Sequence, residues 1–273
     1  RAIKGPFLRR AIFSALVTLT DKIAVNSRAT AGLLPAYTKK ILIVPPGASM
    51  ELLHQTTNPS PFHTKHKLLF VGRHFRRKGI DDILLALVII SKKIPDIECI
   101  FVGGDVMTSP ERLTLEKKRF GMDTDSLDMS RTYSLTDFYK HLAKHLSVAH
   151  LVTFAGKQQN LSRFYAHADI VLLPSKAVIP VEGYEGFGNV LLEAALFKKP
   201  TVATTHFGIP EAVVHNKTGV LVPENNPRRL AYAITSLLTN PERMQKLGLA
   251  GYARVMESYT DLESTKSFIR LYQ

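Results

Sequence analysis

Short apolar segments alternate with longer amphipathic segments from residue 67 to residue 238. The apolar segments predict six strands, at 68–71, 97–102, 151–154, 170–173, 201–204 and 219–222. Helical spacing of apolar residues predicts helices between them, at 79–92, 109–120, 134–146, 160–168, 188–198 and 227–238. Strands that alternate with helices form parallel sheets through right-handed crossovers, so we predict an α/β fold with a doubly wound parallel sheet.

The segments outside this alternation predict a second, smaller unit. Two short strands, at 22–26 and 40–44, follow a helix at 6–19. Residues 54–66 are rich in His, Pro and Thr and lack periodicity, which is typical of a linker. We therefore divide the chain into a small unit at 1–53, a linker at 54–66, a main domain at 67–258 and a C-terminal helix at 259–273.

An excess of basic residues marks the first 50 positions. Eight Lys and Arg residues (1, 4, 9, 10, 22, 28, 39 and 40) stand against one acid, Asp21, and the whole chain carries a net charge of +13. The asymmetry indicates either an anionic partner, such as a membrane surface or a phosphorylated substrate, or a solvated basic face, which is the commoner arrangement. The helix at 6–19 fits a membrane surface, but we favour packing on a sheet.

Cysteine content and hydropathy narrow the class of protein. The one cysteine, Cys99, lies in a predicted strand, which indicates a buried, inert thiol and fits a reducing cytosol. No segment reaches the ~20 apolar residues that a membrane-spanning helix needs. The chain begins at Arg1 rather than Met, and we expect a fragment of a longer protein.

Residues 185–193 (EGFGNVLLE) contain two glutamates with a glycine-rich turn and the start of a helix between them. The free N–H groups and the positive dipole end of a helix N-terminus at Gly188 predict a seat for a diphosphate. Glu193 lies five residues further, about 7.5 Å along the helix, where a ribose would follow. Glu185 precedes the turn, where a transferred sugar would lie. Glycines before a helix are also common punctuation, which leaves a purely structural interpretation open.

Residues 72–79 (GRHFRRKG) follow the first strand of the main domain and form a cationic loop. The carboxyl ends of parallel strands lie at one edge of a sheet, so Arg73 and Lys78 are expected near the proposed diphosphate, whose developing charge they would stabilise. We assign Arg76 and Arg77 to a solvated surface. We also assign the aromatic rings of Phe70, Phe164 and Tyr165 to the core, and His206 and His215 to turns.

Together these motifs resemble glycosyltransferase family 4. The resemblance is carried by Gly72-Arg73 with Lys78-Gly79, by the segments 101–104 (FVGG) and 168–175 (ADIVLLPS), and by 185–194 (EGFGNVLLEA) and 208–211 (GIPE), over about residues 20–260. This family comprises retaining nucleotide-sugar transferases of the GT-B fold, in which two Rossmann-like domains face each other. The chain would supply the C-terminal, donor-binding domain and a truncated remnant of the N-terminal, acceptor-side domain.

The resemblance implies a role for each motif residue. Arg73 and Lys78, next to Gly72, would bind the diphosphate, and Glu193 would accept hydrogen bonds from the ribose hydroxyls. Glu185 would position the donor sugar together with the backbone of the turn and helix start, which comprises Gly186, Phe187, Gly188, Asn189 and Val190. Arg73, Lys78 and Glu185 would take part in catalysis. The loop at Gly156-Lys157 resembles the base-contacting loop of the family.

The resemblance further implies no cofactor and no metal. Asp123-Thr124-Asp125 is similar to the metal-binding motif of the other transferase fold, GT-A, but no strand precedes it, and we assign it to a solvated turn. The expected partners are a nucleotide-sugar donor, a glycan, lipid or small-molecule acceptor, and an anionic membrane surface, with no nucleic acid. We expect a cytoplasmic protein. Peripheral association with the inner face of a membrane is the alternative location.

The sequence departs from the family in several segments. The acceptor-side glycine loop and the histidine of the catalytic region have no counterpart in this chain, residues 105–132 are longer than usual, and 175–184 is variable. The favoured function is transfer of a hexose from a nucleotide-diphosphate sugar. The alternatives are a sugar phosphorylase of the same fold and an inactive nucleotide-binding or interaction module.

Overall fold

The computed structural model of the chain describes residues 15–125, 127–178, 183–270 and 272. Its main element is a six-stranded sheet of order β10-β9-β8-β3-β4-β7. The strands are β3 (His66–Val71), β4 (Ile97–Val102), β7 (Val152–Gly156), β8 (Ile170–Leu173), β9 (Thr201–Thr204) and β10 (Val220–Val222). Every neighbouring pair is parallel. The predicted doubly wound α/β sheet is therefore confirmed.

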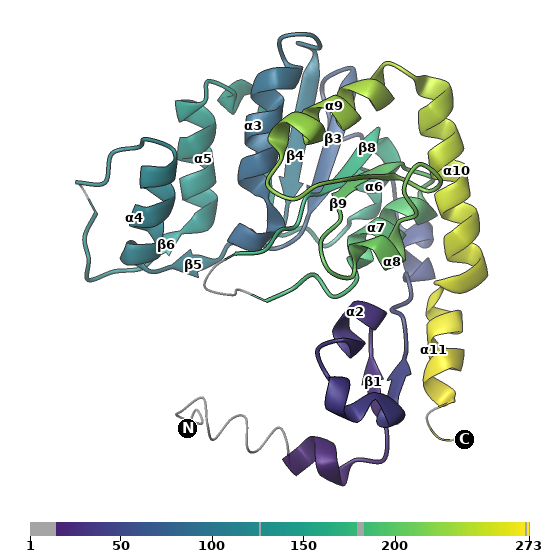
Figure 1. The fold of residues 1–273 in the computed structure, drawn as a ribbon. Coiled ribbons are helices and arrows are strands. Elements are labelled where there is room, and N and C mark those ends of the chain that lie inside the picture. Colours follow the sequence, from purple (N-terminus) through teal and green to yellow (C-terminus); the bar gives the residue numbers. More distant parts are fainter. Residues whose placement is uncertain (1–14, 126, 179–182, 271, 273) are drawn as a thin grey trace.

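Helices cover both faces of this sheet (Figure 1). Along β3, Leu68 and Phe70 face the cluster that contains α3 (Ile80–Ile90), α5 (Leu135–His145) and α9 (Pro227–Leu238). The alternate residues, Leu69 and Val71, face α6 (Ser162–His167) and α7 (Asn189–Leu196). Successive side chains of a strand point to opposite faces, so a strand buried on both sides is apolar throughout, which explains the continuous apolar segments of the sequence.

Side-chain caps fix where several helices begin. Each capping oxygen accepts a hydrogen bond from the backbone N–H three residues later, at Ser109 for α4 (Pro110–Arg119), Ser134 for α5, Asn226 for α9 and Asn240 for α10 (Pro241–Ser258). Proline occupies the first or second position of α4, α9 and α10, where a missing N–H costs nothing. The predicted boundaries of α4, α5 and α9 agree with the structure to within one residue.

The long segment 105–132 holds α4, as predicted, and a two-stranded ladder that was not predicted joins its start to the residues just after its end. Met107–Thr108 (β5) pairs antiparallel with Tyr133–Ser134 (β6), just before α5. Strands of two residues carry too little alternation to be recognised in a sequence. The ladder closes the segment on itself, so α4 packs beside α5 at one end of the main sheet (Figure 1).

The N-terminal part forms a separate small sheet. β1 (Ile23–Val25) pairs in parallel with β2 (Ile41–Ile43), with α2 (Arg28–Ala31) between them. Only residues 15–19 of the helix expected at 6–19 are described, and they are helical. Within them Val17 is buried, but Leu16 and Leu19 are 60% and 83% exposed, so packing on a sheet is not observed for these two side chains.

Hydrogen bonds join the N-terminal part to the main domain, and two sets of them lie next to the small sheet. The Glu211 carboxylate, on α8 (Ile209–Ala212), accepts hydrogen bonds from the backbone N–H groups of Arg28 at 2.9 Å and Ala29 at 3.0 Å. At the second connection, Ala48 N–H donates to the Tyr259 carbonyl at 2.8 Å. Nearby, the Ser264 hydroxyl on α11 (Asp261–Ile269) donates to the Pro45 carbonyl at 2.7 Å.

Three smaller expectations concern single residues and hydropathy. Cys99 is fully buried, and the rings of Phe70, Phe164 and Tyr165 lie in the core, as predicted. The Asp125 N–H donates to the Asp123 carboxylate, which confirms an exposed turn at 123–125. Among the described residues, no helix combines the length and apolar character needed to cross a bilayer.

Candidate functional site

The winding direction of the sheet reverses between β3 and β8. From β3 the chain moves to β4 and β7 on one side, then returns to build β8, β9 and β10 on the other. The loops that leave the carboxyl ends of β3 and β8, at 72–79 and 174–188, therefore begin side by side. Ligands of open α/β sheets bind in the crevice at such a reversal.

A close backbone approach locks these two loops together. Gly79 has a φ of 71°, and a Cβ at this position would lie 2.1 Å from the Pro174 carbonyl oxygen. Only glycine fits there without displacing the backbone. Beside this contact, the Lys176 N–H donates to the Arg77 carbonyl at 2.8 Å. The backbone of the cationic loop (residues 72–79) is thus fixed against the loop that leads to Glu185.

Lys78 and Glu185 meet at the centre of this region. The Lys78 Nζ donates to Glu185 Oε2 at 2.5 Å, Arg77 Nη1 donates to the same oxygen at 3.2 Å, and the Ser175 hydroxyl donates at 3.1 Å. The side chains of Lys78, Glu185 and Arg77 are 11%, 12% and 15% exposed. Two cations and a hydroxyl thus converge on one oxygen of a largely buried carboxylate.

Burial and charge act unequally on the two partners. Burial lowers the pKa of Lys78 below its ordinary value, and the attraction of Glu185 offsets this only in part. Burial alone would raise the pKa of Glu185, but the charge and hydrogen bond of Lys78, with help from Arg77 and Ser175, hold that pKa below its ordinary value. Glu185 is therefore a carboxylate at neutral pH, an acceptor of hydrogen bonds rather than an acid.

The other predicted cation, Arg73, lies at the edge of this cluster. Its side chain is exposed, and its guanidinium carbon lies 4.6 Å from the centroid of the Phe75 ring. Its charge acts on Lys78, whose pKa it lowers. Gly72 lies beneath Lys78, because a Cβ at Gly72 would stand 3.8 Å from Lys78 Cε. Arg73 does not contact Glu185, so the structure brings together Lys78 and Glu185 directly and Arg73 at longer range.

The helix that follows Glu185 begins where the sequence predicted. Gly188 has a φ of 91° and precedes the first residue of α7, Asn189. The residue at the N-cap position is Gly188, and no side-chain oxygen caps this N-terminus. The N–H groups around Val190 therefore have no side-chain cap. Gly186 adjoins this turn. The Phe187 side chain is 2% exposed and packs against the Tyr259 ring at 5.5 Å, so it is a core side chain.

Glu193 has a partner that the sequence analysis missed. The Tyr165 hydroxyl donates to Glu193 Oε2 at 2.6 Å. Burial raises the pKa of Glu193 above its ordinary value, and the hydrogen bond from Tyr165 opposes this. Tyr165 was assigned to the core because of its apolar ring. The ring is indeed buried, but its hydroxyl also holds a glutamate of the predicted site, as buried tyrosine hydroxyls need a partner.

The assignment of Arg76 and Arg77 to a solvated surface is wrong. Arg77 donates to Glu185, and Arg76 pairs with Glu116 on α4. His206, assigned to a turn, is 3% exposed, and its Nδ1 lies 2.8 Å from Glu224 Oε1. A run of cations in one loop does not reveal which of them turn inward, because this depends on acids more than 30 residues away.

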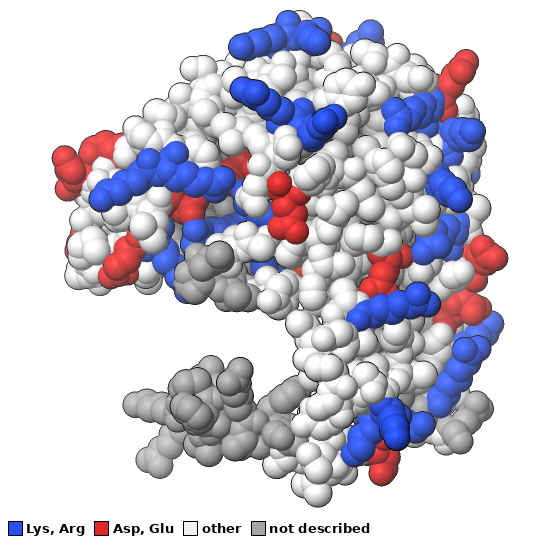
Figure 2. Space-filling model, in the orientation of Figure 1, with Lys and Arg blue, Asp and Glu red and all other residues white. Residues whose placement is uncertain are grey.

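A buried ion network lies behind the cationic loop. Lys176 is 3% exposed and donates to Asp81 at 2.6 Å and to Asp82 at 3.0 Å, both on α3. Arg119 on α4 donates to Asp81 at 2.9 Å. Together with the pair between Arg76 and Glu116, this network connects the segment 105–132 to the loops that carry Lys78 and Glu185. Figure 2 shows Lys and Arg side chains beside the hollow between the main sheet and the N-terminal part.

The comparison with known families decides the class of protein. The sequence profile described as "Glycosyl transferases group 1" matches residues 56–254. The chain belongs to the group 1 glycosyltransferases. The matched range contains every residue of the site described above. It also contains the segment 105–132, which is therefore an element within the group 1 domain.

Relatives of this glycosyltransferase include two named enzymes. A D-inositol 3-phosphate glycosyltransferase from Segniliparus rotundus is 29% identical over 250 residues, which cover 87% of this chain and 49% of the relative. A GDP-mannose-dependent alpha-(1-6)-phosphatidylinositol monomannoside mannosyltransferase from Mycobacterium tuberculosis is 31% identical over 183 residues, 66% of this chain and 40% of the relative. The chain thus spans about half the length of the relatives it matches.

Solved structures confirm the fold of this glycosyltransferase. Anabaena HepE, crystallised with UDP and glucose, superposes with a TM-score of 0.76 at 17% identity, over 98% of this chain and 67% of that one. Sucrose-phosphate synthase from Thermosynechococcus elongatus gives a TM-score of 0.72 at 24% identity, over 98% of this chain and 62% of that one. At these identities the likeness concerns the Rossmann-like architecture alone.

Proposed function

We propose that this chain is the donor-binding part of a retaining glycosyltransferase of family 4 that moves a hexose from a nucleotide-diphosphate sugar. The observation that supports this most directly is the convergence of Lys78 and Arg77 on Glu185 at the sheet reversal, next to the uncapped N-terminus of α7. Cations and unpaired N–H groups together suit a diphosphate, and a carboxylate suits sugar hydroxyls.

Each residue then has a distinct role. Lys78 and Arg73 bind the diphosphate, and Arg77 joins them. The N–H groups from Phe187 to Val190 bind the α-phosphate, while Gly72, Gly186 and Gly188 allow close backbone approach. Glu193 accepts hydrogen bonds from the ribose through Oε1, since Oε2 already accepts the Tyr165 hydroxyl. The pair formed by Lys78 and Glu185 opens when donor enters, and the sugar hydroxyls take the place of the ammonium group on Glu185.

The proposed reaction needs charge stabilisation at one oxygen. The bond between the sugar C1 and the β-phosphate oxygen breaks, and its electron pair stays on that oxygen. Lys78 and Arg73 stabilise the resulting charge. The acceptor hydroxyl oxygen bonds to C1 from the same face, and its proton passes to the departing phosphate. These cations take the part that a metal plays elsewhere, so we propose a metal-free reaction and expect nucleotide affinity unchanged by EDTA.

The names of the relatives suggest donor and acceptor classes. GDP-mannose appears in the name of one relative, and UDP with glucose in one solved structure. Inositol phosphate and a phosphatidylinositol mannoside appear among the acceptors that the names imply. Among glycan, lipid and small-molecule acceptors, we therefore propose polyol phosphates and their lipids first. The expected contact with an anionic membrane stays a prediction, because most of the basic helix at 6–19 lies outside the described residues.

Calorimetry with UDP, GDP and ADP tests the proposal. We expect one of the three to bind, and we expect Glu193→Gln to weaken it by about 1–3 kcal/mol, or roughly 5- to 150-fold, because a charged acceptor of ribose hydroxyls is lost. The control is Glu263→Gln on exposed α11. No binding by any nucleotide, or an unchanged affinity in the Glu193 variant, refutes the assignment.

The same titrations separate the alternatives. Binding of inorganic phosphate without any nucleotide would favour a sugar phosphorylase. Nucleotide binding without release of nucleotide by the full-length protein, across donors and acceptors, would favour an inactive binding module.

A further inference from the structure

Tyr165 on α6 meets one side of α7 with both its ring and its hydroxyl. The side chain is fully buried, and the hydroxyl donates to Glu193 Oε2 at 2.6 Å. The ring stacks on Phe197, with the centroids 5.6 Å apart and the planes 17° from parallel. Phe197 follows Glu193 by four residues, so the two side chains are neighbours along the helix. The stacked ring thereby fixes the place of the hydroxyl beside Glu193.

The Glu193 carboxylate depends on this hydroxyl more than Glu185 depends on any one partner. Within the described chain, Glu193 accepts one side-chain hydrogen bond, from Tyr165, and forms no ion pair. Glu185 accepts three hydrogen bonds, and two of the donors are cations. A glutamate side chain has several rotamers, and a single contact selects among them at position 193. The orientation of the Glu193 carboxylate therefore depends on one neutral hydroxyl.

Helix α6 is itself held from behind, by the chain that precedes the main domain. The Ser162 hydroxyl donates to the Leu52 carbonyl at 2.5 Å. Just before the helix, the Asn160 amide donates to the Thr56 carbonyl at 2.8 Å. These contacts anchor a helix of only six residues, which would be marginal without them. Tyr165 thus projects from an anchored element.

Burial and hydrogen bonding agree on which group donates. Burial raises the pKa of Tyr165 well above its ordinary value, so the hydroxyl keeps its proton at neutral pH. Burial also raises the pKa of Glu193, and the hydrogen bond from Tyr165 opposes this by favouring the charged form. The hydroxyl therefore helps to keep Glu193 an acceptor.

We propose that Tyr165 is a positioning residue of the ribose site, which holds Oε2 of Glu193 so that Oε1 is oriented to accept from the ribose hydroxyls. This inference rests on the proposed function, in which Glu193 binds the ribose of the nucleotide. An acceptor that is already oriented loses less side-chain freedom when the ligand binds, so its hydrogen bonds contribute more to affinity. The preference for ribonucleotides over 2′-deoxyribonucleotides therefore depends on the Tyr165 hydroxyl.

Paired titrations measure this preference. The chain is titrated in a calorimeter with UDP, GDP and ADP, and then with the 2′-deoxy form of each nucleotide that binds. Loss of the 2′-hydroxyl removes a donor to a charged acceptor, so we expect the wild type to bind the deoxy form about tenfold more weakly. Tyr165→Phe keeps the ring and removes the hydroxyl, and the preference should fall to about twofold.

A double-mutant cycle separates positioning from general support of the core. Glu193→Ala removes the carboxylate, so adding Tyr165→Phe to it should change the preference no further. A tyrosine that only supports the core would act differently. Its loss would weaken the ribose and deoxyribose forms equally, with or without Glu193.

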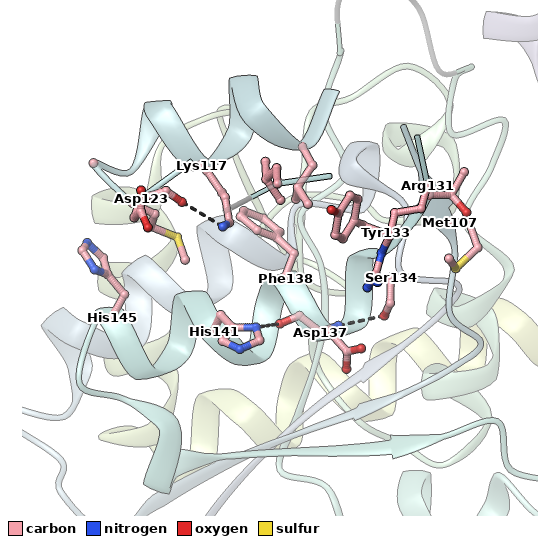
Figure 3. Close-up of a pocket in the computed structure, with 15 residues that line it drawn as sticks. Met107, Lys117, Asp123, Arg131, Tyr133, Ser134, Asp137, Phe138, His141 and His145 are labelled. Carbon is pink, nitrogen blue, oxygen red and sulfur yellow. Dashed lines mark hydrogen bonds between the residues drawn. The ribbon is translucent and has the colours of Figure 1, made fainter. Parts of the chain in front are cut away.

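Tyr133→Phe is the matched control. Tyr133 lines a cavity between α4 and α5, shown in Figure 3, and its hydroxyl accepts the N–H of Asp128 at 2.7 Å. The substitution also removes a hydrogen-bonded tyrosine hydroxyl, but α5 packs on the face of the main sheet opposite to α6 and α7. The preference for the ribonucleotide should stay at its wild-type value.

Each outcome bears on a different statement, with folding of every variant checked by circular dichroism. A full preference that survives in Tyr165→Phe overturns the positioning role and leaves the nucleotide site standing. Equal binding of both forms by the wild type also overturns it, because Glu193 then does not recognise the ribose. Failure of every nucleotide to bind refutes the proposed function itself.

Discussion

Replacing Lys78 by methionine tests how the centre of the site is held. The side chains of Lys78 and Glu185 are 11% and 12% exposed and meet at 2.5 Å. Loss of one partner of a buried ion pair costs about 3–5 kcal/mol, because the remaining charge is buried without compensation. Arg77 still donates to Glu185 at 3.2 Å, so we expect Lys78→Met to lower the free energy of unfolding by about 2–3 kcal/mol at pH 7.

The loss of stability in Lys78→Met should depend on pH in a defined direction. In the wild type the pKa of Glu185 lies below its ordinary value of 4.5, so its contribution to stability is complete above that pH and disappears as the pH falls through the lowered pKa. In Lys78→Met, burial is the dominant influence and raises this pKa. The folded variant then takes up a proton as the pH falls from neutral towards 4.5. The difference in free energy of unfolding between the wild type and the variant therefore becomes smaller.

Urea unfolding followed by circular dichroism at several pH values measures both effects. Lys140→Met is the matched control, since Lys140 pairs with Asp137 on the exposed face of α5, and it should change stability by less than ~0.5 kcal/mol. Glu185→Gln in the Lys78→Met background should recover most of the loss, because no buried charge is left unpaired. A loss below ~0.5 kcal/mol at pH 7, or a gap that widens towards low pH, would contradict the reasoning.

Three further predictions concern backbone, ion network and thiol. Gly79→Ala should lower the free energy of unfolding by at least about 2 kcal/mol in urea titrations, because the φ of 71° and the nearby Pro174 carbonyl leave no room for a Cβ. Gly104→Ala is the control: a Cβ added there has no atom within 4 Å, so the free energy of unfolding should fall by less than ~1 kcal/mol. Lys176→Met should cost about 3–5 kcal/mol at neutral pH. Burial and Asp81 already raise the pKa of Asp82 above its ordinary 3.8, and loss of Lys176 raises it further. The folded variant therefore takes up protons as the pH falls towards 3.8, and the loss of stability relative to the wild type becomes smaller. A loss of stability that stays constant with pH would exclude this explanation. Burial raises the pKa of the Cys99 thiol, so native protein should react with Ellman's reagent only at the rate of unfolding, and rapid reaction would show an accessible thiol.

The sequence predicts the main sheet well because its strands and helices carry clear local patterns. β4 is apolar at nearly every position and lies between two other strands, and α4 begins with Ser109 and Pro110, whose preference for a helix start is strong. The ladder of β5 and β6 was not predicted, because two residues per strand give no periodicity. Its pairing joins residues that are 25 and 27 positions apart, Thr108 with Tyr133 and Met107 with Ser134, and no local pattern records this.

The site is predictable in its motifs but not in its partners. Lys78 and Glu185 stand out because each lies beside a glycine at the end of a strand or the start of a helix. Arg77 and Tyr165 do not, because their roles depend on which distant carboxylate lies within reach in the folded chain. The opposition of Lys176 to two aspartates on α3 is likewise a consequence of tertiary structure.

Two sets of hydrogen bonds lie where the small sheet of β1 and β2 meets the main domain. One is the Glu211 carboxylate on the backbone of Arg28 and Ala29, and the other is the contact of residues 45–48 with Tyr259 and α11. Arg28 and Ala29 are the first two residues of α2, and their N–H groups have no acceptor within that helix, so the Glu211 carboxylate supplies the acceptors that this short helix lacks. A carboxylate of the main domain thereby completes a helix of the N-terminal part, and Glu211→Ala would leave both N–H groups without these acceptors.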